Sequence, residues 1–122
     1  MDNECFGPTA RAMETLERFF PFPENCDRQE WEMTLADPAK IDRMLDVLES
    51  EPLDIDDRTA LCLVTTWSFE EAFEQGEENL EQMSRASGLI RDDRTVFERI
   101  RFYWTTWGFT YESSLLKELL SP

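Results

Sequence analysis

The sequence predicts an all-α protein, a single-domain irregular bundle of six or seven helices that spans residues 1–122. Apolar residues recur at helical spacing along most of the chain, and proline, glycine and capping residues separate the periodic segments. No alternating apolar and polar run bounded by hairpin turn residues is present. The length of 122 residues is typical of one domain, and 41% hydrophobic residues with nine Phe and four Trp indicate a folded core rather than a disordered chain.

The amino-terminal part of the sequence contains start and stop signals for three helices. A first helix follows Pro8 and ends before Pro21, because proline interrupts helical hydrogen bonding. A short second helix is expected between Asn25 and Leu35. Asp37-Pro38 combines an N-cap with proline at the first helical position, so it opens a third helix, which ends at Glu51-Pro52.

The longest predicted helix covers residues 57–75. Its apolar positions form a broad stripe that includes Trp67 and Phe73, so both side chains are expected to be buried. Acidic residues at its start favour the positive end of the helix dipole, and Gly76 is the expected stop. The β-branched run Val64-Thr65-Thr66 is too short to override its helical surroundings.

Three further helices are predicted in the carboxy-terminal part. A short helix is expected over residues 77–86, with Gly88 as its breaker. Asp92 or Asp93 caps the next helix, whose apolar residues from Val96 to Trp107 follow the helical repeat. A final helix is expected over residues 110–120, which contain four leucines.

The composition argues against an enzyme and against a bound cofactor or metal. The chain has no histidine, which removes the commonest general base and transition-metal ligand, and only four glycines, with no phosphate-binding motif. Asp54, Asp56 and Asp57 resemble the start of a calcium loop, but Thr59 replaces the glycine that such a loop needs and Thr65 replaces the bidentate acid. We therefore predict a non-catalytic protein.

The charge argues against direct nucleic-acid binding, and the short apolar runs argue against a membrane-spanning segment. A net charge of −15 is the opposite of the basic footprint that direct nucleic-acid binding needs. The longest apolar run, residues 60–64, is far too short to span a bilayer, and the amino terminus lacks the pattern of a secretory signal. Three cysteines at wide spacing predict reduced thiols, so the expected location is the cytoplasm.

The strongest functional feature is a cluster of glutamates, here called the acidic ridge. The window from Asp42 to Glu81 holds thirteen acidic and two basic residues. Like charges at helical spacing repel one another, and no base lies among them to offset that repulsion. The ridge is therefore either a solvated face that keeps the protein soluble or a surface that docks a partner. Its members are Glu70, Glu71, Glu74, Glu77, Glu78 and Glu81, and Asp54, Asp56 and Asp57 form a second patch.

Aromatic residues between Phe102 and Tyr111 form the other notable cluster. Tyr103, Trp104 and Trp107 match the helical period and are expected in the core. Phe102 lies off that stripe, so it either packs against the last helix or is exposed as a binding anchor.

Three segments carry a resemblance to known proteins: Asp57-Arg58-Thr59-Ala60-Leu61, Ser68-Phe69-Glu70-Glu71 and Phe102-Tyr103-Trp104-Thr105-Thr106-Trp107. They resemble sequences of small, acidic, helical bacterial proteins, some of which are similar to immunity proteins that neutralise toxins delivered between bacteria. The resemblance covers about half of the chain. It implies a cytosolic inhibitor of a cognate toxin, often a basic nuclease, and it implies no catalytic residues.

The leading hypothesis is thus an immunity-type inhibitor that binds a basic toxin domain through the acidic ridge, with the Asp54 to Asp57 patch and Phe102 as further contacts. The first alternative is a phage-type mimic of nucleic acid, such as an anti-restriction or anti-CRISPR protein, that uses the same carboxylates. An adaptor or chaperone module is a second alternative. A small-molecule enzyme that uses two carboxylates is a further alternative, from another functional class.

Overall fold

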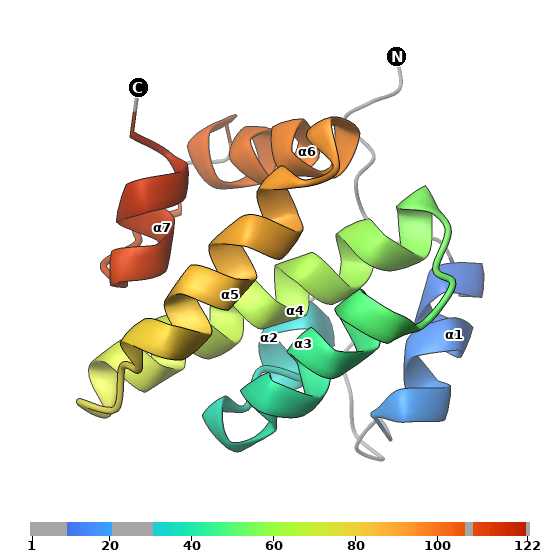
Figure 1. Ribbon diagram of the computed structural model, residues 1–122, viewed down its shortest axis with the longest axis horizontal. Helices are drawn as coiled ribbons and strands as arrows, with labels where there is room; N and C mark the ends of the chain where they lie inside the picture. Colours follow the sequence, from blue (N-terminus) through green and yellow to red (C-terminus); the bar gives the residue numbers. More distant parts are fainter. Residues whose placement is uncertain (1–9, 21–30, 107–108, 122) are drawn as a thin grey trace.

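The computed structural model describes residues 10–20, 31–106 and 109–121, and within them every regular element is helical. The all-α prediction is confirmed, and Figure 1 shows the helices packed in an irregular bundle. In chain order the elements are α1 (Ala10–Phe19), α2 (Trp31–Thr34), the 3₁₀ helix η1 (Pro38–Lys40), α3 (Ile41–Ser50), α4 (Ile55–Glu74), α5 (Leu80–Arg91), α6 (Arg94–Thr106) and α7 (Ser114–Leu119).

Helix α4 is the centre of the bundle. It packs against α1, α2, α3, α6 and α7, and it crosses the middle of the molecule in Figure 1. The run from Thr59 to Thr66 is buried without interruption, because neighbouring helices cover α4 on several sides. No helix in the described ranges is both long and apolar enough to cross a lipid bilayer.

Buried hydroxyl groups in α4 are satisfied within the helix. Thr65 and Ser68 donate to carbonyl oxygens one turn earlier, of Leu61 and Val64, at 2.8 Å in both cases. The Ser68 hydroxyl also accepts a hydrogen bond from the backbone N–H of Asp37 at 2.9 Å, which fixes the start of η1 against α4. The buried hydroxyl groups of α4 therefore have hydrogen-bond partners, and they do not prevent the helix from packing against its neighbours.

The order of the predicted helices agrees with the structure, but three starts differ, those of α4, α5 and α7. Helix α4 begins at Ile55, two residues before the predicted start, because the Asp54 side chain accepts from the N–H of Asp57 and acts as the N-cap. The Asp37-Pro38 signal is confirmed as a cap, although the first turn is a 3₁₀ helix. Residues 21–30, which include most of the predicted second helix, lie outside the described residues.

The two glycines of the α4–α5 region behave differently. Gly76 has a φ of 71°, a left-handed conformation that glycine adopts without strain, and it ends α4 as predicted. Gly88 does not break its helix, and that prediction is wrong: α5 continues to Arg91, and the N–H of Asp92 still donates to the Gly88 carbonyl at 3.0 Å. A single glycine lowers helix stability by about 1 kcal/mol, which is too little to end a helix that is packed on its neighbours.

Three other expectations need correction. Phe73 is 38% exposed and Trp67 is half-buried, so the buried stripe of α4 does not include them fully. The last helix begins at Ser114 rather than at residue 110, because the Ser113 hydroxyl caps it by accepting from the N–H of Leu116. Helix α5 begins at Leu80 rather than at residue 77, because Asn79 is its N-cap.

Candidate partner-binding surface

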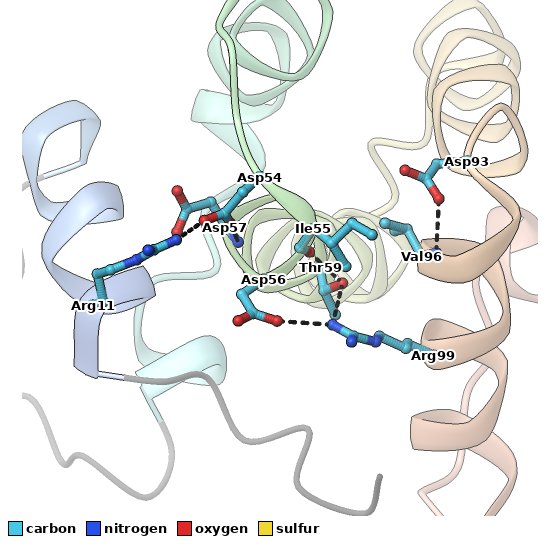
Figure 2. Close-up of polar contacts among 9 residues, drawn as sticks. All are labelled: Arg11, Asp54, Ile55, Asp56, Asp57, Thr59, Asp93, Val96 and Arg99. Atoms are coloured by element: carbon cyan, nitrogen blue, oxygen red, sulfur yellow. Dashed lines mark hydrogen bonds and ion pairs between the residues drawn. The ribbon is translucent and has the colours of Figure 1, made fainter.

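The patch of Asp54, Asp56 and Asp57 lies at the amino-terminal end of α4, between α1 and α6. Figure 2 shows Arg11 of α1 paired with Asp54 on one side of the helix and Arg99 of α6 paired with Asp56 on the other. The Arg99 Nη1 lies 3.0 Å from the Asp56 Oδ1. These carboxylates therefore cap α4, complement its dipole and join it to two neighbouring helices.

Asp57 is the most buried member of this patch, with 7% of its surface exposed. Its Oδ1 is buried and has no hydrogen-bond partner among the described residues. A partner could not reach this carboxylate without moving the helix end. The patch was predicted as a second contact surface, and that stays a prediction: Asp54 and Asp56 have intramolecular partners but remain exposed, whereas Asp57 is buried.

The acidic ridge lies at the opposite end of α4, where the α4–α5 turn forms one edge of the molecule (lower left in Figure 1). It is not the face of a single helix. Glu70, Glu71 and Glu74 belong to α4, Glu77 and Glu78 lie in the turn, and Glu81 is in the first turn of α5.

Two of the six glutamates have structural partners, contrary to the expectation that nothing within the protein offsets their charge. Glu70 accepts from the backbone N–H groups of Glu112 and Ser113 at 2.8 and 2.9 Å. Glu78 accepts from the N–H of Ser114 at 2.7 Å and from its hydroxyl at 3.1 Å. Both carboxylates therefore satisfy N–H groups at the start of α7, where the helix dipole also favours negative charge.

The other four members are Glu71, Glu74, Glu77 and Glu81, and none of them forms an ion pair with a basic residue in the described part of the chain. Acids elsewhere do form such pairs: Arg85, for example, lies 2.8 Å from Asp46 and 2.6 Å from Glu49. Partial burial, together with the negative charges of Asp37 and Glu74, raises the pKa of Glu71. These four carboxylates therefore have no basic side chain within ion-pair distance in the described part of the chain.

A pocket of roughly 330 Å³ opens beside the ridge. Glu70, Glu71 and Glu74 line it together with Trp67 of the same helix, Met33 of α2 and Phe109 of the segment after α6. We call it the aromatic pocket. Trp67 and Phe109 meet edge to face, with ring centroids 5.5 Å apart and an interplanar angle of 84°.

A chain of two hydrogen bonds holds Trp67 in place. Its indole N–H donates to the Tyr103 hydroxyl oxygen at 3.0 Å, and that hydroxyl donates to the Glu32 Oε2 at 2.7 Å. Burial, and then the bond to Glu32, raises the pKa of Tyr103, so the phenol stays protonated at neutral pH. Sequence reasoning missed this chain, because its members are 36 and 71 residues apart and no local pattern links them.

Phe102, Leu80 and Phe73 are apolar side chains that are partly or largely exposed. Phe102 is half-buried on α6 and does not line the aromatic pocket. Leu80 is 74% exposed and Phe73 is 38% exposed, and the two flank the α4–α5 turn that carries Glu77 and Glu78. The turn thus presents apolar groups beside its carboxylates, and of these groups only the acids were identified from sequence, because Phe73 was expected to be buried.

The described residues offer little for covalent or metal chemistry. Burial raises the pKa of the Cys62 thiol to about 12, so it is not a thiolate at neutral pH. No group of three acids or cysteines comes together in a metal-binding arrangement within the described ranges. Comparison of the chain with protein-family models, curated proteins and solved structures finds no match.

Proposed function

We propose that the protein acts as a binding protein, an immunity-type inhibitor that neutralises a basic toxin domain by docking it on the acidic ridge. The observation that carries this proposal is the set of four ridge carboxylates without a basic partner in the described chain. Two of them, Glu71 and Glu74, lie in the last turn of α4, where they do not stabilise that helix. A cationic surface on a second protein would provide the missing positive charge.

The helix dipole supports a binding role for the acidic ridge rather than a purely structural role. The last turn of α4 contains Glu71 and Glu74 and no basic residue, although the carboxy-terminal end of a helix favours cations. Acids there oppose the dipole and repel each other, by about 0.3–1 kcal/mol for each unfavourable charge. A gain in binding is a physical reason for a sequence to keep them.

The apolar residues beside the ridge support a protein as the partner. Leu80 is the most exposed large apolar side chain in the described residues, and Phe73 is close to it in sequence. Interfaces combine a few apolar or aromatic anchors with a charged rim that steers association. The resemblance to immunity proteins supplies the more specific part of the proposal, namely a toxin as the target.

The test uses the full-length chain as bait in the organism that encodes it, followed by a binding titration with the captured protein at two salt concentrations. Wild-type protein should bind a basic domain, inhibit its activity, and associate more slowly as salt rises. The variant Glu74→Lys/Glu77→Lys should lose at least about 100-fold in affinity, because it places like charges across the interface. We avoid Glu78 in this variant because it caps α7.

Glu14→Lys/Glu17→Lys is the matched control, since it makes the same change in net charge on exposed positions of α1. Its affinity should stay close to that of the wild type. Equal binding by both double variants would exclude the ridge as the docking site. A gene next to a toxin gene would favour the immunity function, whereas a place in a phage operon would favour the nucleic-acid mimic.

A further inference from the structure

We propose that the aromatic pocket is a preformed socket for one arginine side chain of the basic partner. This inference rests on the proposed function and specifies which chemical group the ridge recognises. It also selects part of the ridge: Glu71 and Glu74 line the pocket, whereas Glu77 and Glu81 do not.

Helical geometry places the aromatic ring and the carboxylates together. Glu70, Glu71 and Glu74 follow Trp67 by three, four and seven residues, so all four side chains lie on one face of α4. Each of them lines the pocket, and Met33, Phe109 and Glu112 line it from other segments. A cation in this pocket would therefore meet an aromatic wall and carboxylates at the same time.

The aromatic wall is already ordered without a ligand. Trp67 packs on Trp104 with centroids 4.6 Å apart, and its N–H is held by Tyr103. Tyr103 in turn stacks on Phe109 at 5.0 Å with an interplanar angle of 21°. Because the Tyr103 hydroxyl donates to Glu32, its oxygen becomes a stronger acceptor for the indole N–H, and the rings are fixed in position before binding.

The carboxylates of the pocket differ in how they are used. Both oxygens of Glu70 accept backbone N–H groups, so this residue shapes the wall rather than binding a ligand. The side-chain carboxylates of Glu71 and Glu74 form no ion pair with a described basic residue. Partial burial, and then the negative charges of Asp37 and Glu74, raise the pKa of Glu71, and a bound cation would favour its ionised form.

A guanidinium group fits this environment better than an ammonium group or a metal ion. It is planar, it is weakly hydrated, and it can stack on an indole while its N–H groups reach carboxylates at the edge. A lysine ammonium is more strongly hydrated and has no flat face for stacking. Hard metal ions need a shell of closely placed oxygen ligands, and the carboxylates of the described residues do not come together in such an arrangement.

The test is an NMR titration of the ¹⁵N-labelled full chain with Nα-acetyl-arginine amide, with the neutral isostere Nα-acetyl-citrulline amide at equal ionic strength as the ligand control. The arginine compound should produce saturable shifts at the Trp67 indole N–H and at the amides of residues 109–112. The titration extends to about 50 mM, where a ligand with a dissociation constant of about 1 mM is saturating.

Two charge-neutral variants separate the pocket from the rest of the ridge. Glu71→Gln should weaken arginine binding about fivefold, whereas Glu77→Gln, which removes the same charge outside the pocket, should leave it unchanged within about twofold. Equal losses in the two variants, equal shifts with citrulline, equal binding of Nα-acetyl-lysine amide, or no saturable shift would each overturn the arginine assignment.

The two proposals can fail separately. If the captured partner binds the ridge with the expected salt dependence but arginine amide does not bind, only the socket is wrong. If arginine amide binds in the pocket but the Glu74→Lys/Glu77→Lys protein retains its partner, the docking function of the ridge is wrong.

Discussion

The two ends of α4 carry similar numbers of acids in opposite electrostatic settings. At the amino-terminal end, Asp54 caps the helix and pairs with Arg11, and Asp56 pairs with Arg99, so both charges stabilise the fold. At the carboxy-terminal end, Glu71 and Glu74 oppose the helix dipole and have no basic partner in the described chain.

This difference shows that a cluster of acidic residues in a sequence does not by itself indicate a binding surface. Both groups of acids looked like contact surfaces when only their spacing was known. The contacts divide them into carboxylates that stabilise the protein and carboxylates that do not, and the second class is the better candidate for binding. Four changes test that division, because each predicts a different sign or size of effect on the free energy of unfolding.

The largest expected effect is at Glu70, the one member of α4's carboxy-terminal group with a clear structural role. Glu70→Ala should lower the free energy of unfolding by about 2 kcal/mol, because it removes the acceptor of two backbone N–H groups, one of which belongs to the fully buried Ser113. Urea titration followed by circular dichroism measures this. A loss as small as that of an ordinary surface substitution would place Glu70 with the free carboxylates.

At the other end of the helix, Asp54→Ala should cost about 1 kcal/mol, because the cap of α4 and the pair with Arg11 are lost together. Asp54→Asn is the matched control, since asparagine is an equally good N-cap but carries no charge. The same urea titration should show a smaller loss for Asn than for Ala. If both variants were as stable as the wild type, the cap would not contribute to stability.

A smaller effect of opposite sign is expected from Glu74→Lys/Glu77→Lys. This double variant should be as stable as the wild type or more stable by about 0.5 kcal/mol, because Lys at position 74 complements the dipole and follows Glu70 by four residues. The gain should shrink in high salt, which screens exposed charges. A clear destabilisation in thermal or urea unfolding would mean that these acids do have a structural role.

The smallest effect concerns the pH dependence contributed by Glu71. The pKa of the Glu71 carboxyl is raised in the folded state. The free energy of unfolding therefore falls as the pH rises and this group ionises, because ionisation is less favourable in the folded state than in the unfolded state. Glu71→Gln should therefore be more stable than the wild type at neutral pH, by about 0.3 kcal/mol or less because the group is largely solvated. The two proteins should converge at a pH below the usual range of glutamate titration, and urea midpoints at both pH values would show whether they do.

The sequence was sufficient for the fold class, the course of α4 and the stop at Gly76, because these depend on local periodicity and backbone preference. It was insufficient where contacts between distant segments determine which side chains have partners. Glu70 meets Glu112 across 42 residues, and Trp67 meets Tyr103 across 36, so no local pattern separates these side chains from their neighbours. Gly88 shows the converse: a local breaker is overruled by packing.

The attachment of α7 has a kinetic consequence. A six-residue helix is too short to persist alone, so α7 depends on its buried leucines and on the two glutamates that hold its first turn. Segments of this kind open and close independently of global unfolding, which makes their amides exchange with solvent early. Because Glu70 both holds α7 and lines the aromatic pocket, an occupant that stabilises the pocket should slow amide exchange in α7, a helix it need not touch.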